Sequence, residues 1–193
     1  TNELEKDTIF VVSKQNEKFK DKAINSGFEL LNSSELKNYL DMSSIKIIGV
    51  TGTNGKTTTA STIYKILLNL GYKVALQGTR GFFINELCIE DYSLTTPVQL
   101  GNFINIQKAI QNSCQFFIME VSSHAIEQNR IEGLSFALKI HTNITRDHLD
   151  YHKTIEEYIR VKNLFLSDES KKLINIDDKV VKFNSTNAFT YSL

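Results

Sequence analysis

Residues 45–58 read IKIIGVTGTNGKTT, and the fold is best approached from this stretch. Its first six residues are apolar apart from Lys46, as expected of a strand that is buried on both faces. A turn rich in Gly and Thr follows. Residues 58–70 then repeat apolar side chains at helical spacing, and Gly71 is suited to end that helix. A buried strand, a glycine turn and a helix in this order predict one unit of a parallel sheet.

The turn inside this stretch has the composition of a phosphate-binding loop. Glycines let the backbone fold tightly, so that successive N–H groups point at phosphate oxygens, and the helix N-terminus adds partial positive charge. A lysine and a threonine hydroxyl follow, suited to a phosphate and to Mg²⁺. Val50 stands where the standard motif has its first glycine, and a chance glycine-rich turn is the alternative. We predict nucleotide binding by Gly52, Thr53, Asn54, Gly55, Lys56, Thr57 and Thr58.

Strand and helix patterns alternate through the rest of the chain. Strands are predicted at 73–77, 116–121, 136–143 and 172–176, and helices at 100–111 and 154–166. The last helix begins with a capping box, in which Thr154 bonds forward and Glu157 reaches back. This alternation predicts an α/β fold with a doubly wound, mostly parallel sheet, which binds ligands at the carboxyl ends of its strands.

The first 44 residues are predicted to form a different unit. Its strands are expected at 8–12 and 28–31, its helices at 16–26 and 34–40, and a polar linker at 41–44. A segment of this length with so few apolar residues would hardly fold alone. We therefore predict that residues 1–44 are the end of a small α/β N-terminal domain and that residues 45–193 form the central nucleotide-binding domain.

Composition argues against several classes of protein. The 193 residues hold 22 Lys and Arg against 22 Asp and Glu, so no basic excess favours a nucleic acid or a membrane surface as partner. The apolar runs are too short to cross a bilayer. Cys88 and Cys114 lack metal-ligand spacing and are expected to be reduced thiols. We expect a cytoplasmic monomer without nucleic-acid or membrane partners.

Polar side chains follow two of the predicted strands. Glu120 lies near the end of strand 116–121, where a Mg²⁺ ligand is wanted beside a phosphate loop, and an ordinary strand-end carboxylate is the alternative. Residues 142–152, TNITRDHLDYH, place two histidines among aspartates after the next strand. They indicate a polar site. Zinc is less favoured because its ligand patterns are usually tighter, and either histidine alone could be structural.

Lys162 lies on the apolar stripe of the helix predicted at 154–166. A charged lysine that faces a core is costly unless it snorkels to solvent or is chemically altered. One alteration is reaction of the amine with CO₂, because the carbamate is an anion that presents two oxygens to a metal. The sequence leaves snorkelling and carbamylation both open.

Together these residues resemble the Mur ligases, and among them the MurE group. The resemblance covers nearly the whole chain, and Lys162 stands where the family carries a carbamylated lysine. Thr1 and Asn2 fall at an Asp-Ser-Arg-like segment of the uridine-binding domain, where the match is degraded. The related MurF enzymes and folylpolyglutamate synthases share the phosphate loop but lack EVSSH and DHLDYH in this form. The matching segments are GTNGKTT (52–58), TTP (95–97), MEVSSH (119–124) with Gln128 and Arg130, and TRDHLDYH (145–152).

The resemblance implies an ATP-dependent, ADP-forming ligase of peptidoglycan synthesis, and thus a part in cell shape and division. It would join diaminopimelate or lysine to UDP-N-acetylmuramoyl-L-Ala-D-Glu through an acyl phosphate. Lys56 and its loop would bind ATP. Thr57 and Glu120 would hold one Mg²⁺, and His148 and carbamylated Lys162 a second, so that Lys56, Glu120, His148 and Lys162 are the expected catalytic residues. The UDP-muramoyl-dipeptide would contact Thr95, Thr96, Ser122, Gln128 and Arg130.

The family's C-terminal domain, which grips the incoming amino acid, is expected to be absent, so this chain alone is not expected to complete the reaction. Two alternatives remain from the sequence. One is a folate-type ligase of the same superfamily, and the other is a nucleotide-binding regulatory module without catalysis. The combination of the phosphate loop with Glu120, His148 and Lys162 argues against the regulatory module, which needs no second metal site.

Overall fold

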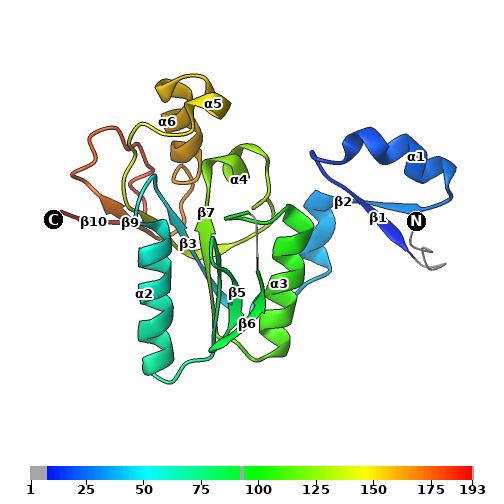
Figure 1. Ribbon diagram of the computed structural model, residues 1–193, viewed down its shortest axis with the longest axis horizontal. Coiled ribbons are helices and arrows are strands. Elements are labelled where there is room, and N and C mark those ends of the chain that lie inside the picture. Colours follow the sequence, from blue (N-terminus) through cyan, green and yellow to red (C-terminus); the bar gives the residue numbers. More distant parts are fainter. Residues whose placement is uncertain (1–7, 92–93, 193) are drawn as a thin grey trace.

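The computed structural model describes residues 8–91 and 94–192, so Thr1 and Asn2 lie outside the described residues. Within this part, eight strands form the larger sheet, in the spatial order β10-β9-β8-β3-β7-β4-β5-β6 (Figure 1). The strands are β3 (Lys46–Thr51), β4 (Val74–Gly78), β5 (Gly81–Ile84), β6 (Leu87–Glu90), β7 (Phe116–Val121), β8 (Phe136–His141), β9 (Lys172–Asn175) and β10 (Ala188–Tyr191).

The predicted α/β fold with a mostly parallel sheet is confirmed. Strand β3 lies at the centre and pairs in parallel with β7 and β8. Only β5 and β6 run antiparallel to their neighbours among the described strands, and they form a hairpin at one edge. That hairpin and β10 were not predicted. Strand β6 is largely exposed, so its sequence lacks the buried apolar pattern that revealed the central strands.

Alternate residues of the central strands face opposite layers of helices. Ile48, Val50 and Ile118 pack against α2 (Lys56–Asn69). Ile47 and Phe117 face the other layer, which includes α3 (Gln99–Gln111), α4 (Ser123–Glu127) and α6 (Ile155–Leu164). Figure 1 shows α2 and α3 on opposite sides of the sheet. The sheet is therefore buried on both faces, which explains the continuous apolar runs of its central strands.

Helix α2 starts earlier than predicted, and the capping box predicted for α6 is only half formed. Helix α2 begins at Lys56, two residues early, because Gly55 adopts a left-handed conformation (φ 84°) and serves as its N-cap. At α6, the Thr154 hydroxyl accepts the N–H of Glu157 at 3.2 Å, as predicted. The return half of the capping box is wrong. The Glu157 carboxylate instead binds Arg160 through two contacts of 2.8 and 2.6 Å.

Residues 8–44 form a separate two-stranded parallel sheet of β1 (Ile9–Val12) and β2 (Glu29–Asn32), with α1 (Lys20–Asn25) between them. The helix predicted at 34–40 is a 3₁₀-helix at Ser33–Asn38. This unit lies beside α3 and α4 (Figure 1). Gln15 Nε2 donates to the carbonyl of Gln128 at 2.6 Å, and Gln99 Nε2 donates to that of Ser33 at 3.1 Å. That residues 1–44 are the end of a larger N-terminal domain stays a prediction.

Among the described residues, no helix combines the length and the hydropathy that crossing a bilayer requires.

Candidate nucleotide and metal site

The glycine-rich loop lies between β3 and α2, at the carboxyl end of the central strand. Gly52 has a φ of 153°, and a Cβ there would lie 1.8 Å from Thr142 Oγ1. Gly52 is therefore required by its backbone conformation and by the close approach of the segment that follows β8. Helix α2 begins at Lys56, so the N–H groups of its first turn have no acceptors within the helix. They point out of the helix N-terminus, where an anion can accept them.

Residues 142–145, which we call the clasp, hold the first half of this loop. Thr53 N donates to the carbonyl of Asn143 at 2.7 Å, and Asn54 N donates to the Asn143 side chain at 3.0 Å. The Thr142 hydroxyl donates to Asn54 O at 2.7 Å, and Thr145 N donates to Thr53 Oγ1 at 2.9 Å. The backbone N–H groups of Thr53 and Asn54 are thus engaged by the clasp. Phosphate oxygens are left to the second half of the loop and to α2.

Lys56 bends back over its own loop. Its Nζ donates to the carbonyls of Gly52 at 2.8 Å and Thr53 at 2.9 Å. Burial lowers the pKa of Lys56, and the nearby carboxylates of Glu120 and Asp147 partly oppose this. A cation held among carbonyls beside a helix N-terminus is suited to attract an anionic ligand.

Glu120 is buried beside the loop, where the sequence placed it. Its carboxylate accepts the hydroxyl of Thr57 at 2.9 Å, the N–H of Thr79 at 3.0 Å and the hydroxyl of Thr79 at 3.2 Å. A Cβ at Gly78 would lie 2.2 Å from Glu120 Oε1, so that glycine makes room for the carboxylate. The loop, Thr79, Thr95 and Glu120 line a cavity of about 250 Å³. A carboxylate and a hydroxyl that already touch form an oxygen donor pair that fits Mg²⁺.

Lys162 reaches the same loop from α6. The side chain is 1% exposed, which excludes snorkelling to solvent. Its Nζ donates at 2.8 Å to Gly52 O, the carbonyl that also accepts from Lys56, and it lies 5.1 Å from the centre of the Tyr158 ring. Burial, reinforced by the charge of Lys56, lowers the pKa of Lys162 to about 7, while Asp147 acts in the opposite direction. A neutral amine is thus accessible near neutral pH.

His148, the other predicted ligand of a second metal, is not joined to Lys162 by a hydrogen bond in the described part of the chain. It is exposed and has a left-handed backbone (φ 52°), and its ring lies 5.1 Å from that of His124 and 6.2 Å from that of Tyr158. The Tyr158 ring therefore lies beside both His148 and Lys162. No group of three His, Cys, Asp or Glu residues suited to a metal occurs among the described residues. The second metal site stays a prediction.

The five residues predicted to contact a substrate gather beside Glu120. Thr96 is fully buried, and its hydroxyl donates to Glu120 O at 2.9 Å and accepts the N–H of Ser122 at 3.1 Å. Arg130 Nη1 donates to Thr96 O at 2.8 Å, and its Nη2 donates to Gln128 Oε1 at 2.6 Å. The fifth, Thr95, lies at the phosphate-loop cavity. Thr96 therefore shapes the site by bonding the backbone of Glu120 and Ser122 through its hydroxyl and the side chain of Arg130 through its carbonyl.

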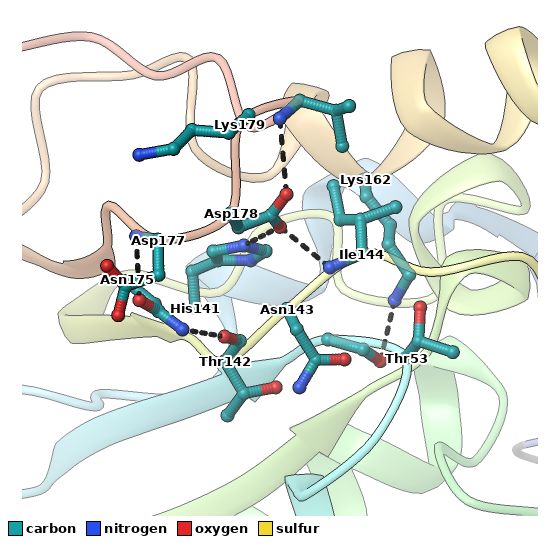
Figure 2. A network of polar contacts seen from close by, with 12 residues as sticks. Thr53, His141, Thr142, Asn143, Ile144, Lys162, Asn175, Asp177, Asp178 and Lys179 are labelled. Carbon is teal, nitrogen blue, oxygen red and sulfur yellow. Dashed lines mark hydrogen bonds and ion pairs between the residues drawn. The ribbon is translucent and has the colours of Figure 1, made fainter. Parts of the chain in front are cut away.

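Several residues of this region were not predicted. Asn143 forms the centre of the clasp, and Asp178 binds both His141 and the N–H of Ile144 (Figure 2). Asn175 Nδ2 donates to Thr142 O at 2.9 Å. The available signal was NIDD, at residues 175–178, where an asparagine near the end of a predicted strand and two aspartates after it lie at the edge of the sheet that binds ligands.

The comparisons with known proteins point to one family. The family model described as "Mur ligase middle domain" matches residues 50–193. The UDP-N-acetylmuramoyl-L-alanyl-D-glutamate–2,6-diaminopimelate ligase of Helicobacter pylori is 52% identical over 196 aligned residues, covering 100% of this chain and 44% of that protein. The Wolinella succinogenes protein of the same name is 62% identical over 149 residues, covering 77% and 34%.

A solved structure of a ligase with this name superimposes with a TM-score of 0.76 at 27% identity, and covers 96% of this chain and 45% of that one. The chain thus spans less than half the length of these relatives.

Proposed function

The chain belongs to the Mur ligase family, and from this premise we propose that it is the ATP-binding part of a ligase that adds the third amino acid to UDP-N-acetylmuramoyl-L-Ala-D-Glu. The observation that carries the proposal is the contact between Thr57 and Glu120 at the N-terminus of α2, next to the ammonium of Lys56. This arrangement offers donors and a cation to a triphosphate and oxygen ligands to Mg²⁺. The names of the relatives favour diaminopimelate over lysine as the added residue.

The chemistry needs an activated carboxylate, because a carboxylate does not form an amide with an amine at neutral pH. Attack of the substrate's D-Glu carboxylate on the terminal phosphorus of ATP would give an acyl phosphate and ADP, and the amine would then displace phosphate. The first step brings two anions together. Lys56 and the first turn of α2 supply fixed positive potential where that charge accumulates. Bound Mg²⁺ would add Lewis-acid neutralisation of the phosphates.

Lys162 is proposed to act as a carbamate. Its neutral amine would attack CO₂ to form an N–C bond, and loss of one proton would leave an anionic carbamate. Because burial lowers its pKa to about 7, the amine can reach its neutral, nucleophilic form near neutral pH. Carbamylation would also replace two adjacent cations, Lys56 and Lys162, by an opposite-charge pair. Conversion to a buried anion with two oxygens suits a metal ligand, with His148 as the proposed partner.

The test uses Lys56→Ala in the full-length protein, with ADP release measured in the presence of the UDP-muramoyl-dipeptide and either diaminopimelate or lysine. Loss of one preorganised charge partner should lower kcat by about 10²–10³-fold. Lys65→Ala is the matched control, because Lys65 lies on the same helix but is exposed and pairs with Glu86. Near-normal ADP release by Lys56→Ala would refute the proposed role. Turnover with lysine but not with diaminopimelate would refute the choice of amino acid.

A further inference from the structure

Asp178 supports the clasp from outside the proposed catalytic set. His141, the last residue of β8, is fully buried, and its Nε2 lies 2.7 Å from Asp178 Oδ2. The same oxygen accepts the N–H of Ile144 at 2.7 Å, and Oδ1 accepts the N–H of Val180 at 3.2 Å. Figure 2 shows Asp178 between the ring of His141 and the backbone of Ile144. One carboxylate therefore fixes the chain immediately before and within the clasp.

The neutral ring of His141 depends on Asp178 as its hydrogen-bond acceptor. Burial lowers the pKa of His141, and the smaller effect of Asp178 opposes it, so the ring is neutral near pH 7. Since a carboxylate only accepts, the ring proton is assigned to Nε2. Nδ1 has no partner among the described residues. Asp178 is thus the acceptor that anchors the His141 ring, and its loss would leave buried N–H groups without a partner.

We propose that Asp178 is a positioning residue for nucleotide binding, acting through the clasp on the phosphate loop. The inference rests on the proposed ATP site. The clasp engages the N–H groups of Thr53 and Asn54 and packs Thr142 against Gly52, so it sets the shape in which the second half of the loop meets phosphate. Without the bonds made by Asp178, the loop must become ordered when the nucleotide binds. The conformational entropy lost in that ordering lowers the affinity.

A positioning role predicts a selective effect on one substrate. The residues beside Glu120 that would contact the muramoyl substrate are held by bonds of their own, such as that of Arg130 to Thr96. Asp178 takes no part in these bonds. A general loss of packing would weaken the binding of both substrates, whereas loss of the bonds made by Asp178 would weaken the binding of the nucleotide alone.

The experiment compares Asp178→Asn with Asp168→Asn in the full-length protein. Asp168 is the matched control, because it binds Lys139 of the same strand β8 at 2.6 Å and lies outside the clasp. Calorimetric titration with Mg·ADP should give a Kd raised about tenfold in Asp178→Asn, in line with loss of a charge-assisted hydrogen bond. The KM for UDP-muramoyl-dipeptide should stay unchanged. Amide hydrogen exchange at residues 52–55 should quicken in Asp178→Asn and not in Asp168→Asn.

A nucleotide Kd no higher in Asp178→Asn than in Asp168→Asn would overturn the inference, and so would an equal rise in both substrates' constants. His141→Ala keeps the bond between Asp178 and Ile144 and covers the case in which Asp178→Asn does not fold. It should raise the nucleotide Kd about threefold, and an unchanged value would overturn the inference. If the unaltered protein fails to bind Mg·ADP, the proposed ATP site itself fails. Binding that is normal in all variants contradicts the role of Asp178 alone.

Discussion

Lys162 occupies a position where an ordinary lysine is costly. Its pKa is depressed in the folded protein to about 7, from an ordinary value of 10.5. Below pH 7 the folded protein carries the full penalty of the buried cation. The penalty declines as pH rises through 7 toward 10.5, because in that range the unfolded chain binds more protons than the folded one. The side chain therefore opposes folding most strongly in acid.

Replacing Lys162 by Met should raise the thermal midpoint in CO₂-free buffer, and by more at pH 6 than at pH 9. The apolar side chain has a similar length and removes the buried charge. Lys139→Met is the matched control, since Lys139 is also buried but pairs with Asp168, which would lose its partner. Scanning calorimetry at both pH values measures the effect. An increase of equal size at pH 6 and pH 9 would contradict the depressed pKa.

Most of the residues that meet at the phosphate loop could be predicted from the sequence. Lys56, Thr57, Glu120 and Lys162 follow from a loop motif, a strand end and a misplaced charge on an apolar stripe. The clasp could not be found in this way. Its bonds to the loop join residues about ninety positions apart, such as Thr53 and Thr145, and no local pattern encodes such a contact. Asp178 has a local signal in NIDD, but its contacts with His141 and Ile144, 37 and 34 positions away, have none.

At the scale of elements, helix α2 is bounded by glycines with positive φ: Gly52 and Gly55 in the loop before it, and Gly71 after it. Gly55 and Gly71 both have positive φ, while Gly52 is additionally packed against Thr142. Gly71 has nothing within 4 Å of where a Cβ would lie. A substitution at the C-terminal end therefore tests the backbone conformation alone, and one at Gly52 tests conformation and packing together.

Gly52→Ala should lower the free energy of unfolding by about 1–3 kcal/mol from overpacking and abolish nucleotide binding. Gly71→Ala should cost about 1–2 kcal/mol for its left-handed backbone and leave nucleotide binding intact. Denaturant unfolding and Mg·ADP titration of both variants check this pair. Nucleotide affinity retained by Gly52→Ala would show that the close approach of Thr142 does not shape the loop.

Helices and central strands were predictable because burial on one or two faces leaves a periodic pattern. Most of the elements that were missed lack such a pattern, although β5 is largely buried and was missed as well. Strand β6 is exposed at the edge of the sheet, β10 at the other edge is only partly buried, and α4 and α5 (Leu149–His152) are too short to show a period. The start of α2 was misplaced because the left-handed backbone of Gly55 leaves no periodic pattern, and the capping box of α6 is only half formed because Glu157 binds Arg160.

At the scale of the molecule, three separated segments meet at the carboxyl end of the parallel strands. The phosphate loop follows β3, Glu120 lies at the end of β7, and the clasp follows β8, while α6 brings Lys162 from behind. This convergence is a consequence of the parallel sheet, since neighbouring strands end on the same edge. The order of strands, with β3 between β7 and β8, places all three segments side by side.

The most direct measurement is a crystal structure of the full-length protein with a non-hydrolysable ATP analogue and Mg²⁺. The terminal phosphate should lie against the first turn of α2 within hydrogen-bond reach of Lys56 Nζ, with a cation between Thr57 Oγ1 and the Glu120 carboxylate, and with carbamate density on Lys162. A nucleotide bound elsewhere, or a cation that contacts neither Thr57 nor Glu120, would contradict the account.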